Sequence, residues 1–165
     1  MNRLSDLRGL FDLKDKVIIV TGAVGLLGRK HVEAIAAFGG HPVLLDLSPT
    51  AVASFAEEIN SEYGVNASGF SVDITDEDRI ADNVVEVVKR YGKIDGLVNN
   101  AANNPRVEDN QLNDCSRLEN FSLDNWNEDI AVGLTGSFLS AKYYGYQISK
   151  NSNGGVIVNI SSDLG

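Results

Sequence analysis

Short, almost continuously apolar runs alternate with longer amphipathic stretches along most of the chain. Five such runs, rich in Val, Ile and Leu, occupy residues 16–22, 41–46, 67–73, 95–100 and 154–162. Runs of this kind predict strands that are buried on both faces, as in a parallel sheet between two layers of helices. Helical spacing of apolar residues is found between the runs, at about 25–39, 49–63, 76–91 and 123–150.

This alternation predicts a βαβαβαβαβ series. Such a series folds as an α/β protein, a Rossmann-like three-layer doubly wound parallel sheet with strand order 3-2-1-4-5. The chain has 165 residues, 43% of them hydrophobic, which is enough for one sizeable core. Because no repeat, low-complexity run or linker interrupts the series, we expect residues 1–165 to form a single domain.

Local chemistry marks the starts of two helices. Thr75 is expected to cap the helix whose first turn is acidic, because a hydroxyl accepts from free amides there. Ser122 or Asp124 is expected to cap the last helix. The apolar stripe predicted for that last helix consists of Ile130, Leu134, Phe138, Ala141, Gly145 and Ile148.

The fifth predicted strand comes last in the expected strand order and therefore lies at an edge of the sheet. Its run "GVIVNIS" would be left partly uncovered there, whereas edge strands are normally short, charged or covered. We therefore expect the chain to need further residues or a partner.

Composition and charge exclude several classes of partner. Fourteen Lys and Arg against 23 Asp and Glu give a formal charge of -9, which repels nucleic acid and anionic membranes. A single cysteine, Cys115, cannot form an internal disulfide, and the two histidines offer no zinc-ligand spacing. The N-terminus has no unbroken apolar run for a signal peptide or a membrane span. We therefore expect a cytoplasmic protein without a metal.

A glycine-spaced turn joins the first strand to the first helix in "VIIVTGAVGLLGRK". Glycines at 22, 25 and 28 permit a tight turn, a close approach of the backbone to a pyrophosphate, and close packing of helix on strand. The helix N-terminus adds amide donors and a positive dipole end. An ordinary strand-to-helix turn is the alternative interpretation of the glycines alone.

Asp46 favours a dinucleotide at this turn. It ends the second strand, about twenty residues after the loop, where an acid accepts hydrogen bonds from the adenosine ribose. The alternative is an aspartate that merely ends a strand. No Arg or Lys follows in "DLSPT", so a 2'-phosphate would be repelled without compensation. The residues therefore predict NAD, and NADP is disfavoured.

The sequence resembles the short-chain dehydrogenase/reductase family from about residue 11 to its last residue. The resemblance rests on "TGAVGLLG", Asp46, "VDITD", "DGLVNNAA" and "GGVIVNISS". It implies that the glycine loop lines the pyrophosphate, that Asp73 and Ile74 lie at the adenine, and that residues 99–101 lie under the cofactor. The implied cofactor-binding set is Thr21, Gly22, Gly25, Leu26, Leu27, Gly28, Asp46, Asp73, Ile74, Asn99, Asn100 and Ala101.

The same resemblance assigns a catalytic position. Ser162, rather than Ser161, matches the serine whose hydroxyl hydrogen-bonds the substrate oxygen. Without the resemblance, "SS" would be interpreted as a polar strand end or a helix cap.

Two positions depart from the family's pattern. Leu26 replaces the usual glycine, giving TGxxGxxG as in the family's extended branch, many of whose members act on sugar nucleotides. The segments "NNAA" and "IVNISS" still resemble the shorter branch. Gly133 replaces an asparagine that helps hold a water in the proton relay, so the resemblance does not extend to the usual relay.

"YQISK" pairs Tyr146 with Lys150 at the spacing that the family uses for proton transfer, in which a lysine favours the phenolate. The family places this pair about a dozen residues after the serine, whereas these residues precede Ser162. By helical phase, Tyr146 lies roughly 110° and Lys150 roughly 150° from the centre of the apolar stripe. We therefore predict a solvent-facing Lys150 at a helix end, and we expect the catalytic pair beyond Gly165.

Four further residues are candidates for chemistry. His31, within the first helix, is interpreted as an exposed or packed histidine rather than an acid or base. Cys115 has no histidine near it in sequence and is interpreted as non-catalytic. Arg106 and Arg117 lie in a long polar loop at 103–120. They could bind a phosphate or carboxylate of the substrate, although solvated loop charges are the more common case.

The resemblance implies an NAD-linked oxidoreductase that interconverts an alcohol and a ketone on a small-molecule substrate, such as a sugar or a sugar nucleotide. It also implies a homo-oligomer, since family members usually pair through helices near the fifth strand. "GLLGRKHVEA" and "VGLTGSF" are similar to members assigned to flagellin-glycan modification. The alternative is an NAD-binding module without turnover that lacks the C-terminal part of the family's fold.

Overall fold

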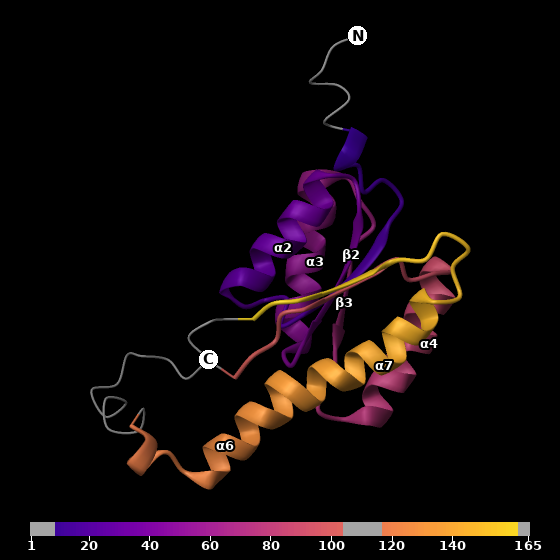
Figure 1. Cartoon of the computed structure of the whole chain (residues 1–165). Coiled ribbons are helices and arrows are strands. Elements are labelled where there is room, and N and C mark those ends of the chain that lie inside the picture. Colours follow the sequence, from indigo (N-terminus) through magenta and orange to yellow (C-terminus); the bar gives the residue numbers. More distant parts are fainter. Residues whose placement is uncertain (1–8, 104–116, 162–165) are drawn as a thin grey trace.

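The computed structural model describes residues 9–103 and 117–161 (Figure 1). The predictions made for Arg106, Cys115 and Ser162 fall outside these residues. Five strands form one parallel sheet in the order β3-β2-β1-β4-β5, which confirms the predicted fold class and strand order. The strands are β1 (Val17–Thr21), β2 (His41–Asp46), β3 (Ser68–Ser71), β4 (Gly96–Asn99) and β5 (Val156–Asn159).

Helices cover both faces of the sheet, in three layers. α2 (Leu26–Ala37) and α3 (Pro49–Tyr63) lie on one face, and α4 (Glu77–Tyr91) and α7 (Ser137–Ile148) lie on the other (Figure 1). Alternate side chains of β1 point to opposite faces of the sheet. Ile18 and Val20 pack toward α2 and α3, whereas Val17 and Ile19 pack toward α4 and α7. Two apolar cores therefore enclose the inner strands, as continuous apolar runs predict.

The helix caps agree in part with the sequence. Ser122 caps α6 (Leu123–Ile130) as predicted, since its hydroxyl accepts from the Asn125 N–H at 3.1 Å. The prediction for Thr75 is wrong, because Asp76 caps α4 through its carboxylate. The Thr75 hydroxyl instead donates to Asp73 at 2.7 Å, which leaves the next side chain to accept from the helix amides. A short 3₁₀ turn, η1 (Leu118–Asn120), precedes α6.

The helix predicted over 123–150 is interrupted in its middle. A π-helical segment, η2 (Ala131–Gly136), separates α6 from α7. Its wider i→i+5 turns shift every later side chain around the helix axis. Gly136 is packed against Ile74, where a Cβ would lie 2.6 Å from the Ile74 Cδ1 atom. A residue with a side chain could not occupy that contact without displacement.

The predicted apolar stripe is partly wrong, since η2 interrupts the 3.6-residue period between Ile130 and the residues of α7. Leu134 and Phe138, expected inside, are 65% and 62% exposed. Ile148 is buried as expected. The buried face of α7 consists of Leu139, Ser140, Tyr144 and Ile148.

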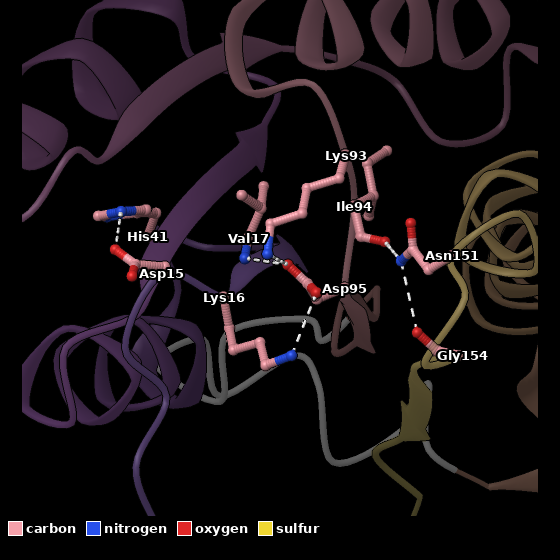
Figure 2. A network of polar contacts seen from close by, with 9 residues as sticks. All are labelled: Asp15, Lys16, Val17, His41, Lys93, Ile94, Asp95, Asn151 and Gly154. Atoms are coloured by element: carbon pink, nitrogen blue, oxygen red, sulfur yellow. Dashed lines mark hydrogen bonds and ion pairs between the residues drawn. The ribbon is translucent and has the colours of Figure 1, made fainter.

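Polar side chains connect neighbouring strands at the side of the sheet where the strands begin, here called its N-terminal edge (Figure 2). The Asp95 carboxylate, only 10% exposed, accepts from the Val17 N–H at 2.9 Å and pairs with Lys93 at 2.9 Å and Lys16 at 3.4 Å. Burial acts to raise the pKa of Asp95, but the Val17 N–H and the two ammonium groups hold it below its usual value. The Asn151 amide donates to the Ile94 carbonyl at 2.7 Å, which extends the network toward β5.

β5 forms an edge of the sheet. Ile157 contacts Gly145 of α7, but Val156 is 57% exposed and Val158 is 42% exposed, as expected for an apolar edge strand that the described residues cover only in part. No helix within residues 9–103 and 117–161 is long and apolar enough to cross a membrane.

Candidate cofactor and substrate site

The glycine loop lies between the end of β1 and the start of α2. Gly22 has a φ of +62°, which favours glycine, and a Cβ there would lie 2.9 Å from the Ala101 Cα atom. A Cβ at Gly28 would overlap the Gly22 carbonyl oxygen. These two glycines therefore allow the turn, the helix and the segment after β4 to pack at backbone contact.

The N-terminus of α2 offers amide donors beside this turn. Gly25 is its N-cap and contributes no side chain to the first amides. The N–H groups of Leu26, Leu27 and Gly28 have no carbonyl one turn earlier in the helix. The Leu26 and Leu27 side chains are 86% and 55% exposed, so they do not fill the space in front of those amides. A pyrophosphate fits an arrangement of this kind.

Asp46 is held next to the glycine loop. Its Oδ2 accepts from the Val24 N–H at 3.0 Å, and its Oδ1 accepts from the Leu47 N–H at 2.8 Å. Each carboxylate oxygen retains a lone pair for a further donor. The adjacent Leu47 side chain is 69% exposed and carries no charge.

Thr21 and Asn100 fasten the loop to the end of β4. Thr21 Oγ1 accepts from the Asn100 N–H at 3.0 Å and from the Ala101 N–H at 3.1 Å. The Asn100 Nδ2 donates to the Thr21 and Gly22 carbonyls at 3.0 and 3.2 Å. Because the Thr21 side chain is fully buried, it positions these segments and does not face the space above the loop.

Asn99 connects β4 to β5 and α7. Its Nδ2 donates to Asn159 Oδ1 at 2.8 Å and to the Ser137 carbonyl at 3.3 Å. Asn99 is 3% exposed, and its Oδ1 has no hydrogen-bond partner in the part of the chain that the structure describes. No role was predicted for Asn159 from the sequence, although it stands in the "IVNISS" match.

Asp73 and Ile74 follow β3 on the same edge of the sheet. Asp73 Oδ1 accepts from the Thr75 N–H at 2.9 Å, which orders this turn. The Ile74 side chain is 6% exposed and packs on Gly136. Because this side chain is buried, only the backbone of Ile74 could contact a ligand.

Two residues that the sequence did not single out meet near the start of the long polar loop. The Asn103 Nδ2 donates to Asp129 Oδ1 at 3.1 Å. Asp129 belongs to α6 and is half-buried. Their separation of 26 positions in sequence leaves no local signal for the pair.

Gly133 lies within η2, and a Cβ built there meets no atom within 4 Å among the described residues. The position is therefore open enough for a larger side chain. Nothing in the packing of the described residues requires glycine at 133.

Lys150 is exposed, as predicted from helical phase, and the Tyr146 side chain is 67% exposed. The Lys150 ammonium lies 4.3 Å from the centre of the Tyr146 ring, and it donates to Gln147 at 3.1 Å. α7 ends at Ile148, and the following Asn151 binds the chain just before β4. The pair is thus near the N-terminal edge of the sheet, opposite the glycine loop.

The remaining candidates lie apart from this site. His31 is partly buried, and its Nε2 has no partner among the described residues. Arg117 is exposed and lies 3.7 Å from Glu119. No group of three or more metal-ligating side chains is found within residues 9–103 and 117–161.

Comparisons with known proteins agree with this geometry. The "short chain dehydrogenase" family model matches residues 16–165. The trans-4-hydroxycyclohexanecarboxylate dehydrogenase of Sinomonas cyclohexanicum is 32% identical over 170 residues, which cover 100% of the chain and 60% of that protein. The NADP-dependent mannitol dehydrogenase of Alternaria alternata is 28% identical over 95% of the chain and 57% of its own length.

A crystal structure of NAD+-bound xylitol dehydrogenase superposes with a TM-score of 0.80. It is 29% identical, and the match covers 91% of the chain and 54% of that protein. The chain therefore spans a little over half the length of these three proteins.

Proposed function

Because the chain belongs to the short-chain dehydrogenase family, we propose that the protein is an NAD(H)-dependent oxidoreductase that interconverts an alcohol and a ketone on a sugar or another polyhydroxylated substrate. The observation that carries the proposal is the N-terminus of α2, with free amides beside a carboxylate, Asp46, that is held against the glycine loop. Mannitol and xylitol dehydrogenases among the similar proteins support the substrate class.

The residues present fit a dinucleotide. The amides of 26–28 would bind its pyrophosphate, Asp46 its adenosine ribose, and the backbone at 73–74 its adenine. Asn99 and Asn100 would support it from below, since both are anchored by hydrogen bonds to neighbouring strands. The Asn99 Oδ1 atom is buried and has no hydrogen-bond partner among the described residues, so a water beneath the proposed site would satisfy it.

The preference for NAD over NADP rests on Asp46 and Leu47. A 2'-phosphate at the ribose would meet the Asp46 carboxylate at short range, and the neighbouring Leu47 supplies no cation to offset the repulsion. The similar proteins include an NADP-dependent and an NAD+-bound dehydrogenase. Asp46 and Leu47 are therefore what support NAD in this protein.

The reaction couples hydride loss to proton loss at one alcohol group. When bound at the glycine loop and Asp46, the dinucleotide would supply the hydride acceptor for oxidation of an alcohol to a ketone. Ser162, which lies outside the described residues, would hydrogen-bond the substrate oxygen, as the resemblance implies. Tyr146 and Lys150 take no part, because they lie at the other edge of the sheet.

A second candidate function is an NAD-binding module without turnover. Gly133 supports it, since the residue that would hold a relay water in the family is absent at an open position of η2. In this alternative, the glycine loop and Asp46 keep their roles, and hydride transfer is lost.

Three further parts of the proposal concern the whole protein. We propose that the protein is cytoplasmic. We also propose that it is a homo-oligomer, because Leu134, Phe138 and β5 expose apolar surface that a second copy could cover. A role in flagellin-glycan modification rests on the similarity of two short sequence stretches alone.

The test uses the complete gene product with NAD+ and a panel of polyols, with absorbance at 340 nm as the readout. Polyol-dependent formation of NADH supports the oxidoreductase. Tight binding of NADH without any hydride exchange would instead favour the non-catalytic module. Failure to bind NADH would contradict both functions.

A further inference from the structure

Asn103 and Asp129 bring two unused acceptor atoms together at the C-terminal edge of the sheet. The Asn103 Nδ2 is bound to Asp129 Oδ1 at 3.1 Å. Among the described residues, no hydrogen bond is made by Asp129 Oδ2 or by Asn103 Oδ1. The one bond thus holds the two side chains together and leaves an oxygen of each for another donor.

The chain places this pair near the other elements of the site. Asn103 follows Asn99 by four residues, so their Cα atoms are at most about 14 Å apart. Asp129 precedes Gly133 by four residues, at the junction of α6 and η2. In doubly wound sheets, ligands bind outside the carboxyl ends of the strands, which is where β4 delivers Asn103.

The chemistry of the pair selects for hydroxyl groups. A carboxylate oxygen accepts a short, charge-assisted hydrogen bond from a hydroxyl, and an amide oxygen accepts a second. Two neighbouring acceptors match the two donors of a vicinal diol. The same carboxylate repels a substrate carboxylate or phosphate, in a chain whose formal charge is already -9.

We propose that Asn103 and Asp129 bind a pair of hydroxyl groups on the substrate, an inference that rests on the proposed function. The pair determines specificity: it favours a neutral polyol or sugar over a simple alcohol, a hydroxy acid or a sugar phosphate. It takes no part in proton transfer.

The test compares Asp129→Asn with the wild type in the complete gene product. Asparagine at 129 keeps an oxygen for Asn103 and removes the charge, so a role limited to holding the two segments together survives the change. Glu128→Gln is the matched control, because it removes one carboxylate from the exposed neighbouring position of α6. KM and kcat are measured with NAD+ for xylitol and for cyclohexanol, which has a single hydroxyl.

We expect Asp129→Asn to raise KM for xylitol about tenfold, the size of one lost charged hydrogen bond. The KM for cyclohexanol, and both values for Glu128→Gln, should stay within about twofold. Equal changes for the two alcohols, or no change for either, would overturn the proposal.

A binding measurement separates this proposal from the proposed function. Saturation-transfer NMR reports xylitol binding to the NADH-saturated protein whether or not turnover occurs. If no alcohol is oxidised, the proposed function fails. The proposal for the pair then stands if Asp129→Asn weakens xylitol binding, and it falls if xylitol binds both proteins equally or neither.

Discussion

At the scale of single residues, the Asp46 carboxylate has two roles that can be separated. It accepts from two backbone amides, and it presents charge where a ribose would lie. Asp46→Asn keeps an acceptor and removes the charge. We expect this change to weaken NAD+ binding. The ratio of the dissociation constants for NADP+ and NAD+ should fall by about tenfold, because the repulsion of a 2'-phosphate disappears.

Fluorescence titration with NADH and NADPH measures this preference. Glu58→Gln, on the exposed surface of α3, controls for the loss of one negative charge from the chain. An unchanged preference in Asp46→Asn would remove Asp46 from the cofactor site.

Tyr146 and Tyr144 make a matched pair on α7. The Tyr146 side chain is exposed, whereas Tyr144 is fully buried and its hydroxyl donates to Asn83 at 2.8 Å. Tyr146→Phe should therefore leave both turnover and the free energy of unfolding nearly unchanged. Tyr144→Phe should lower the free energy of unfolding by about 1 kcal/mol, because Asn83 loses its partner in the core.

Urea unfolding and steady-state kinetics of the two variants check these expectations. A large loss of turnover in Tyr146→Phe, with cofactor binding intact, would show that Tyr146 carries a proton after all.

The site residues proposed from the sequence stand in local patterns, whereas the contacts between those residues and their neighbours are tertiary. The glycines and Asp46 are visible because strand-to-helix turns and strand ends have local signatures. The buried position of Thr21 and the pairing of Asn103 with Asp129 have none, because their partners are 77 to 80 and 26 residues away.

At the scale of elements, the strands were predictable and the last helix was not. Continuous apolar runs identify the buried strands directly, since both faces of β1 pack on helices. The π-helical segment η2 could not be foreseen from the 3.6-residue period. Its last residue, Gly136, packs against Ile74, more than 60 positions earlier in the chain, and no local pattern indicates that contact.

The polar network at the N-terminal edge predicts a pH-dependent loss of stability. The pKa of Asp95 is held below its ordinary value, so the carboxylate stabilises the fold above the unfolded-state pKa of about 4. This contribution is lost as the pH falls through the lower pKa of the folded state. Asp95→Asn should reduce the free energy of unfolding at pH 7 by about 2 kcal/mol, the size of a charged hydrogen bond.

Urea unfolding at pH 7 and at about pH 3 tests this prediction. The difference between wild type and Asp95→Asn should shrink at the lower pH, since the unfolded wild type takes up a proton there and part of the carboxylate's contribution to stability is lost. Asp82→Asn, at an exposed position of α4, is the control and should change little. A difference that is equal at both pH values would show that the charge of Asp95 contributes nothing.

At the scale of the whole molecule, the end of the chain that the structure describes exposes several apolar side chains. Leu134 and Phe138 are exposed on the outer helix, and Val156 and Val158 are exposed on β5. A second copy covering Phe138 would remove it from water, and Phe138→Ser should therefore shift the protein toward monomers.

Sedimentation equilibrium measures this shift, with Val85→Ser on α4 as a control for an exposed apolar residue elsewhere. An unchanged mass distribution in Phe138→Ser would exclude this surface from self-association.

The proposed function requires that NAD binds at the C-terminal ends of the strands. Isothermal titration of the protein with NAD+ and with NADP+ measures this binding. We expect saturable binding of NAD+ with one site per chain, at least about tenfold tighter than that of NADP+. The absence of NAD+ binding, or equal or tighter binding of NADP+, would contradict it.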